Sequence, residues 1–184
     1  GITVFEDYDL AVLRSRIDWG PFFQTWQLPG AFPAILDDPT RGPEARKLLV
    51  DAEAMLDRIA SEGLLRPKAV VGLFHANREG DDIVVWADAQ REREMARLHT
   101  LRQQRQKPSG AANLALADYL CAVDSGVGDT IGAFVVSAGD GLQSMVAEFE
   151  AAHDDYQSIL AKALADRLAE AFAERLHEVV RREL

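Results

Sequence analysis

The chain has 184 residues, of which 48% are hydrophobic and 27% charged, enough for one globular domain over residues 1–184. Acidic residues outnumber basic ones by 30 to 20, which gives a net charge of −10. This charge argues against a nucleic-acid partner, because a surface that binds nucleic acid must neutralise phosphates with basic side chains. No apolar run approaches the roughly 20 residues of a membrane span, and the N-terminus lacks a signal-peptide pattern. We therefore expect a cytoplasmic protein with no membrane partner.

The first 40 residues predict short helical turns, because they hold four of the seven prolines and the aromatic cluster DWGPFFQTW (18–26). Between residues 43 and 62 the apolar positions recur at helical spacing. This segment predicts an amphipathic helix that ends at Gly63.

Two short apolar runs, residues 69–78 and 82–88, predict a β-hairpin with Gly80 in its turn. Both runs carry bulky apolar groups on both faces, with Ile83 and Val85 opposite Val84 and Trp86, so each face of the sheet should be covered. Residues 95–104 permit either a helix or a strand. Residues 129–139 predict a third buried strand that ends in a glycine turn.

The last part of the chain predicts two helices, over residues 142–152 and 156–182. In the second, one face is predicted to form core, with apolar side chains every four residues at Leu160, Leu164, Leu168, Phe172, Leu176 and Val180. Asp166, Glu170 and Glu174 form an acidic row roughly opposite. Taken alone, this row indicates a solvated face.

The sequence contains no phosphate-binding loop, nucleophile elbow or paired Cys-x-x-Cys motif, so no catalytic residue is assigned and enzymatic activity stays open. The single cysteine, Cys121, lies in an apolar run and is expected to be a buried, inert thiol. His153, Asp154 and Asp155 are adjacent and would diverge by 100° each on a helix. They favour a helix junction over a metal site, and no metal ligand is assigned.

Several motifs, in this order and spacing, are similar to a known family. The chain resembles, over residues 9–184, the activation domain of cobalamin-dependent methionine synthase. The most specific block is the twenty residues at 162–181. The motifs are IDWGPFFQTW (17–26), VVGLFHANREGDDI (70–83), LRQQ (101–104), IGAFVV (131–136), AEFEAAHDDY (147–156) and KALADRLAEAFAERLHEVVR (162–181).

This resemblance implies a C-shaped α+β domain, with a bent antiparallel β-sheet flanked by helices and a long C-terminal helix. It also implies a module that binds S-adenosylmethionine and contacts cobalamin through the neighbouring cobalamin-binding domain. Such a module supports reductive methylation of cob(II)alamin to methylcobalamin, with a flavodoxin-type protein as electron donor. The cofactors carry the chemistry, and the module positions them.

Two residues match family positions that hold the ligand. Asp18 matches the carboxylate that takes the ammonium group of S-adenosylmethionine, and Glu170 matches a glutamate near its sulfonium. Asp166, one turn before Glu170, could face the cobalamin domain. Without the resemblance, Asp18 is better interpreted as a helix cap.

The sequence also departs from the family pattern, because it has no Gly-Tyr dipeptide and no arginine loop after the last helix. It begins at Gly1 and ends at Leu184 within a helical pattern, so we expect an incomplete, C-terminally truncated domain. Such a chain should bind S-adenosylmethionine weakly or not at all and could self-associate through an exposed sheet edge. The alternative is a non-binding scaffold or domain-interaction fragment that has lost the ligand site.

Overall fold

A computed structural model describes residues 1–183, without the side chain of Ser109, and its backbone divides into two compact units. The strand unit comprises Gly1–Thr3 and Val71–Phe134, and the helical unit comprises Val4–Val70 and Val135–Leu184. Each unit has its own cluster of buried apolar side chains. The expectation of one domain over residues 1–184 stays a prediction.

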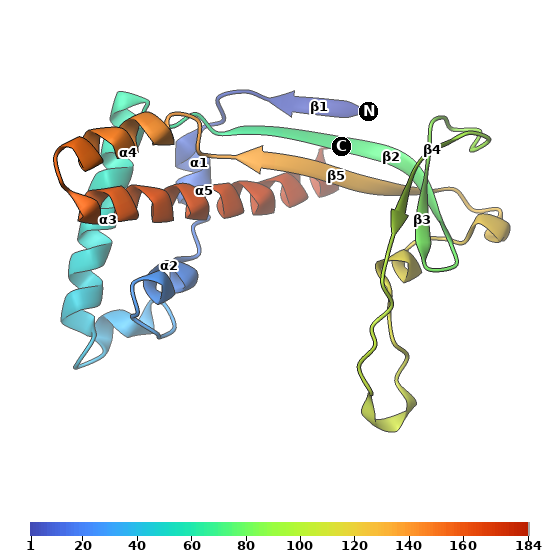
Figure 1. The fold of residues 1–184 in the computed structure, drawn as a ribbon, viewed down its shortest axis with the longest axis horizontal. Helices are drawn as coiled ribbons and strands as arrows, with labels where there is room; N and C mark the ends of the chain where they lie inside the picture. The colour runs from blue at the N-terminus through green and yellow to red at the C-terminus, as the bar shows by residue number, and fades with distance from the viewer. Residues whose placement is uncertain (184) are drawn as a thin grey trace. The chain divides into compact units, whose positions relative to one another are not determined.

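The helical unit is organised around its C-terminal helix, α5, which contacts α1, α2, α3 and α4. Figure 1 shows α4 lying beside α5. The structure confirms short helices in the first 40 residues, the amphipathic helix that follows, and both C-terminal helices. The elements are α1 (Leu10–Arg14), α2 (Trp19–Thr25), a 3₁₀ helix (Ala34–Asp37), α3 (Gly42–Glu62), α4 (Leu142–Ala151) and α5 (Asp155–Arg182). The last helix starts at Asp155, one residue before its predicted start, and ends at Arg182 as predicted.

The apolar stripe of α5 forms core as predicted, with one shift near its end. Its first five members, from Leu160 to Leu176, are fully buried. The sixth buried position is Val179, not Val180 as predicted. A step of four residues turns the helix by 400°, so the stripe drifts by 40° per step and a three-residue step brings it back to the core. Gly63 ends α3 in the left-handed region, at φ 62°, as the sequence predicted.

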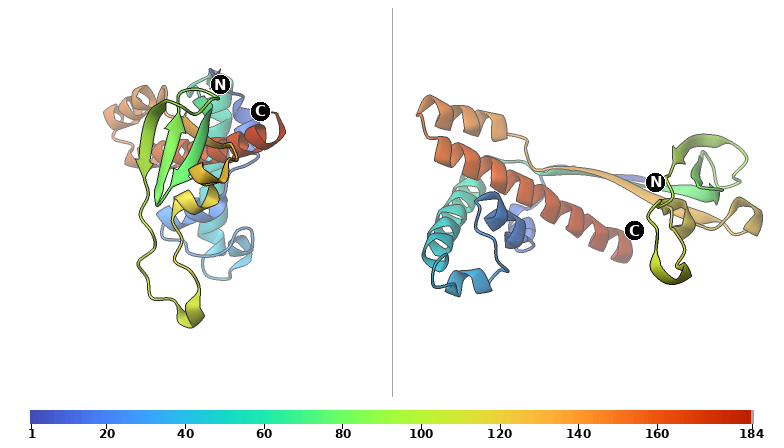
Figure 2. Two further views of the ribbon diagram at one scale, coloured as in Figure 1. Left: turned by 90° about the vertical axis from the view of Figure 1, so that its right-hand side faces the viewer. Right: turned by 60° about the horizontal axis from the view of Figure 1, so that its bottom comes forward.

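The strands form a five-stranded antiparallel sheet in the order β1 (Ile2–Phe5), β2 (Lys68–Glu79), β3 (Asp82–Trp86), β4 (Glu94–His99), with β5 (Asp129–Ser137) paired with β2. The predicted hairpin is confirmed: β2 and β3 are antiparallel and Gly80 takes φ 62° in their turn. Of the ambiguous segment 95–104, only residues 95–99 are strand; they belong to β4, which pairs with β3. Figure 2 shows β2, β3 and β4 side by side. The fold class is therefore α+β, as expected.

β5 is a strand, as predicted, but the prediction that it is buried was wrong. Val135 is 68% exposed and Phe134 is 38% exposed, and only Asp129, Ile131 and Val136 are half-buried. Among the described residues β5 pairs with one strand, β2, so it is an edge strand. An apolar run predicts a strand, but it cannot show whether anything covers both of its faces.

A buried asparagine, Asn77, fixes the loops of the strand unit. Its side chain is 2% exposed, donates to the carbonyl oxygens of Cys121 (3.2 Å) and Val127 (2.8 Å), and accepts from the indole nitrogen of Trp86 (3.1 Å). Cys121 itself is half-buried, so the expectation of full burial was wrong. Its thiol is still a weak nucleophile, because a hydrogen bond with Asp129 raises the pKa of the thiol.

Arg102 holds in place the long loop that connects β4 and β5. Its guanidinium donates to both carboxylate oxygens of Asp118 (2.7 and 2.8 Å), to Asp81 (2.6 Å) and to the carbonyl oxygen of Asn113 (2.6 Å). Paired donation of this kind is the strong form of a charged hydrogen bond. Arg102 therefore holds the pKa of the Asp118 carboxyl well below its usual range.

The ion pair between Arg102 and Asp118 predicts that acid destabilises the loop between β4 and β5. Because the pKa of Asp118 is lower in the folded state, the stabilisation is present above the ordinary carboxyl pKa of about 4 and is lost as the pH falls below it. Arg102→Met should remove this part of the pH dependence, so the midpoint of urea unfolding should fall less between pH 5 and pH 3 than in the wild type. Arg105→Met, in the same loop, is the control and should keep the wild-type dependence. Identical pH profiles for Arg102→Met and the wild type would contradict the expectation.

Candidate functional site

Asp18 lies at the start of α2 and caps it. Its Oδ1 accepts a hydrogen bond from the backbone nitrogen of Gly20 at 2.9 Å, and its side chain is exposed. Gly20 makes this turn easier, because a Cβ atom there would lie 3.2 Å from Oδ1. The geometry thus confirms Asp18 as a helix cap. Its role in binding a ligand stays a prediction. The two are compatible, since the cap uses one carboxylate oxygen.

The aromatic side chains that follow Asp18 anchor this segment to the core, as the sequence predicted. Phe22 and Phe23 are 1% and 0% exposed, with their rings 5.6 Å apart. Trp19 packs edge-on against Phe22 at 5.2 Å, and Trp26 packs against Tyr156 of α5 at 5.1 Å. Asp18 therefore projects from a backbone that the core holds in place.

Glu170 and Asp166 are both exposed on α5, and a single arginine binds both. Arg167 donates to Asp166 Oδ2 at 2.7 Å and forms an ion pair with Glu170 Oε2. The Arg167 side chain is only 14% exposed, against 73% for Asp166 and 52% for Glu170. The acidic row is exposed, as predicted, and a largely buried cation orients two of its members. Arg167 was missed by the sequence reasoning, although its position three residues before Glu170 is a recognisable ion-pair spacing.

The segment that carries Asp18 is tied to α5, but not at Glu170. Arg16, two residues before Asp18, donates to Glu178 Oε2 at 2.8 Å and lowers the pKa of the Glu178 carboxyl. Glu178 lies two turns beyond Glu170, or about 12 Å along the helix axis. Both α1 and α2 contact α5. The structure thus places the two predicted site residues on packed elements of one unit, while their carboxylates have separate partners.

A polar hollow of about 450 Å³ lies beside this connection. Its walls carry charges of both signs, which suits a zwitterionic or polar molecule better than an apolar one. Neither Asp18 nor Glu170 is among its lining residues, but Arg16 and Glu174 are their near neighbours in sequence. The lining residues are Arg16, Glu174, His177, Glu178 and Arg181.

The residues considered for a metal have another role. Asp154 caps α5 by accepting a hydrogen bond from the backbone nitrogen of Gln157 at 3.1 Å, and His153 takes φ 55° at the junction with α4. Within residues 1–183 no group of three or more His, Cys, Asp or Glu side chains is arranged to hold a metal ion. None of the helices in the same range is long and apolar enough to cross a membrane.

These features define an α+β domain that presents ion-paired charges along one face of a long C-terminal helix. Residues 9–184 match the family described as "Vitamin B12 dependent methionine synthase, activation domain". The chain belongs to this family. It is also similar to a crystal structure of the MetH reactivation domain bound to AdoHcy, with 50% sequence identity and a TM-score of 0.94. The match covers 100% of this chain and 56% of that chain, so this chain spans about half of its length.

Proposed function

We propose that this domain binds S-adenosylmethionine and supports the reactivation of cobalamin-dependent methionine synthase. The observation that carries the proposal is the 50% identity, over the whole of this chain, to a reactivation domain bound to AdoHcy. AdoHcy is the thioether that remains when S-adenosylmethionine gives up its methyl group. A domain that recognises one of them presents the shape needed for the other.

Membership of the family supports the assignment to methionine synthase. The individual steps of reactivation are our proposal. In this proposal the domain supports the reductive methylation of cob(II)alamin to methylcobalamin. S-adenosylmethionine supplies the methyl group through its sulfonium, and a flavodoxin-type protein supplies the electron. The cobalamin-binding domain of the same enzyme is the expected partner, and a cytoplasmic location remains a prediction. This chain contributes residues that bind and orient.

Asp18 is proposed to take the ammonium group of the ligand. Its Oδ1 is used by the cap on Gly20, so Oδ2 is the atom we assign to the ligand. A carboxylate about 4 Å from a cation near a protein surface attracts it by about 4 kcal/mol before desolvation is subtracted. The aromatic anchors of α2 keep this carboxylate in place, which lowers the entropy lost on binding.

Glu170 is proposed to lie near the sulfonium, and Arg167 to position it. Because Arg167 binds Oε2 of Glu170, the side chain is oriented and Oε1 is available to a second cation. The same guanidinium orients Asp166, which is proposed to face the cobalamin-binding domain. The low exposure of Arg167 means that its position is set by packing, and the two carboxylates follow it.

The proposal predicts that Asp18→Asn weakens binding of S-adenosylmethionine without lowering stability. Losing one charge-assisted contact should cost roughly 1–3 kcal/mol, which is about a 5- to 150-fold loss of affinity. Asparagine caps a helix about as well as aspartate, so the melting temperature should barely change. Titration of the amide resonances by NMR measures even weak binding.

Asp9→Asn is the matched control, because Asp9 caps α1 through the same contact, from Oδ1 to the backbone nitrogen of Ala11 at 2.8 Å. It should bind S-adenosylmethionine like the wild type. Equal affinities for Asp18→Asn and Asp9→Asn would remove Asp18 from the proposed site. A fall in the melting temperature with unchanged affinity would leave Asp18 with a capping role alone.

A docking scaffold is the second candidate, and the exposed apolar face of the strands favours it. A shallow groove of about 240 Å³ is lined by residues of β1, β2 and β5, among them Val4, Phe5, Val70, Val135 and Val136. Val4 and Val135 are 59% and 68% exposed, and such strands can pair with a second copy of the chain. This alternative would be favoured if S-adenosylmethionine shifted no resonance while light scattering showed concentration-dependent self-association.

A further inference from the structure

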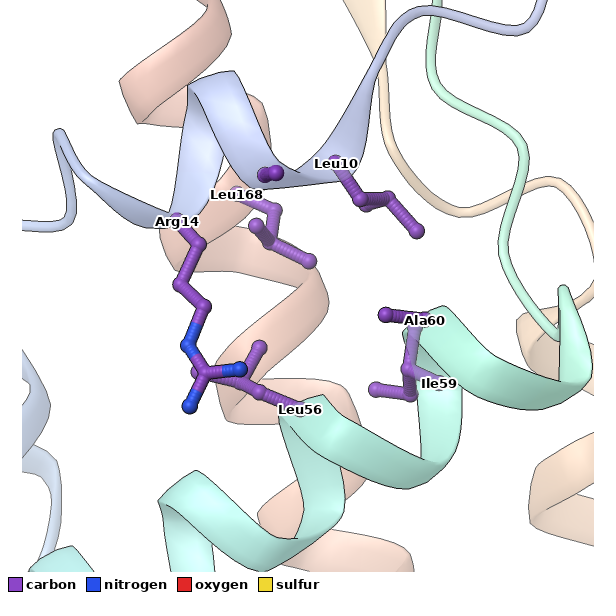
Figure 3. A pocket seen from close by; sticks show the side chains of 7 residues that line it. Leu10, Arg14, Leu56, Ile59, Ala60 and Leu168 are labelled. Carbon is purple, nitrogen blue, oxygen red and sulfur yellow. The ribbon is translucent and has the colours of Figure 1, made fainter.

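An apolar pocket of about 70 Å³ lies where α1, α3 and α5 meet in the helical unit. Figure 3 shows Leu10 and Arg14 of α1 facing Leu56, Ile59 and Ala60 of α3. Leu168 of α5 lies between α1 and α3. The pocket is separate from the proposed ligand site. Leu168 lies two residues from both Asp166 and Glu170, and is therefore turned by about 200° from each of them around the helix axis. The lining residues are Leu10, Ala11, Arg14, Leu56, Ile59, Ala60 and Leu168.

The pocket has a buried floor and a small-residue rim. Leu168, Ile59 and Leu56 are 0%, 1% and 4% exposed and form the floor. At the rim, Ala11 of α1 and Ala60 of α3 are exposed. Because both are alanines, no longer side chain fills the space between the two helices, and the apolar floor remains accessible.

Arg14 is the polar side chain of the lining, and its charge is already satisfied. Its guanidinium forms an ion pair with Glu53 and another with Asp57, at 2.5 Å, so it joins α1 to α3. A water molecule needs two to four hydrogen-bond partners to occupy such a space, and apolar-lined cavities stay dry. A charged or strongly polar ligand would likewise find no free partner on this lining.

The volume of the pocket limits the size of the molecule that it can bind. A space of about 70 Å³ is several times the roughly 10–15 Å³ that one water molecule needs, and about half of an apolar cavity of roughly 150 Å³ that takes benzene or xenon. We propose that this pocket binds a small, neutral, apolar molecule of a few heavy atoms, held by contact with Leu56, Ile59 and Leu168.

Xenon is the probe for this site, because it is neutral, apolar and compact. Amide resonances of the ¹⁵N-labelled chain are recorded under increasing xenon pressure, with nitrogen at the same pressures as the reference. We expect saturable shifts at residues 10–14, 56–60 and 168. Shifts that are spread over the whole chain and rise linearly with pressure would overturn the proposal.

Variants that fill the pocket provide a second test of the proposal. Ala60→Leu and Ala11→Leu add a side chain from opposite sides of the rim, and at least one should weaken xenon binding tenfold or more. Ala54→Leu is the matched control, because Ala54 is an exposed alanine of the same helix outside the pocket and should bind like the wild type. Wild-type xenon binding in both filling variants would also overturn the proposal. The spectra themselves show that each variant is folded.

Discussion

Replacing Phe172 by alanine should lower the free energy of unfolding by about 3–5 kcal/mol, the range for truncating a buried aromatic side chain. Phe172 is fully buried on α5, and its ring lies 4.6 Å from the ring of Tyr8. Tyr8 in turn accepts a hydrogen bond from Arg175 Nε at 3.0 Å, so it is held in place and cannot collapse easily into the space left behind. The cavity term should therefore be large.

Urea unfolding followed by circular dichroism measures this loss. Glu174→Ala, two residues further on the exposed face of α5, is the control and should change stability by no more than about 0.5 kcal/mol. Phe172→Leu retains most of the volume and should lose less than half as much as Phe172→Ala. A loss below about 1 kcal/mol for Phe172→Ala would show that the helices around α5 relax far more than the packing suggests.

The regular elements were predictable because their signals are local. The four-residue spacing from Leu160 to Leu176 and the glycine after residue 62 identified α5 and the end of α3. The turn at Gly80 identified the hairpin for the same reason. In each case the property that makes the element form, a repeating apolar face or a positive φ, is written into a short stretch of sequence.

The environment of each element was less predictable, because it depends on partners that are distant in sequence. The run around Val135 resembles a buried strand, yet it lies at an edge. Cys121 lies in an apolar run, yet its backbone nitrogen donates to Asp129 and its side chain is half exposed. Apolar composition reports what a segment could bury, and the topology decides what it does bury.

The candidate site shows the same division. The motif around Asp18 and the acidic row of α5 could be found from sequence, and the structure places both on packed elements of one unit. The arginines could not be assigned in the same way. Arg16 meets Glu178 across 162 residues of sequence, and the burial of Arg167 depends on packing around α5. These two cations decide how the acidic groups are oriented, so the site's electrostatics required the structure.

Gly141 gives the second large expected effect, because two independent features require glycine there. It takes φ 99° at the start of α4, a conformation that side chains disfavour, and a Cβ atom would overlap the carbonyl oxygen of Leu64. Gly141→Ala should therefore lower the free energy of unfolding by roughly 2–5 kcal/mol, from backbone strain and from displacing the chain at Leu64. Gly139→Ala is the control: its added Cβ would meet only Ser137 Oγ, at 4.0 Å, and it should unfold at nearly the wild-type urea concentration. If both alanine variants unfold together, the turn before α4 is free to move away from Leu64 and the close approach is not required for folding.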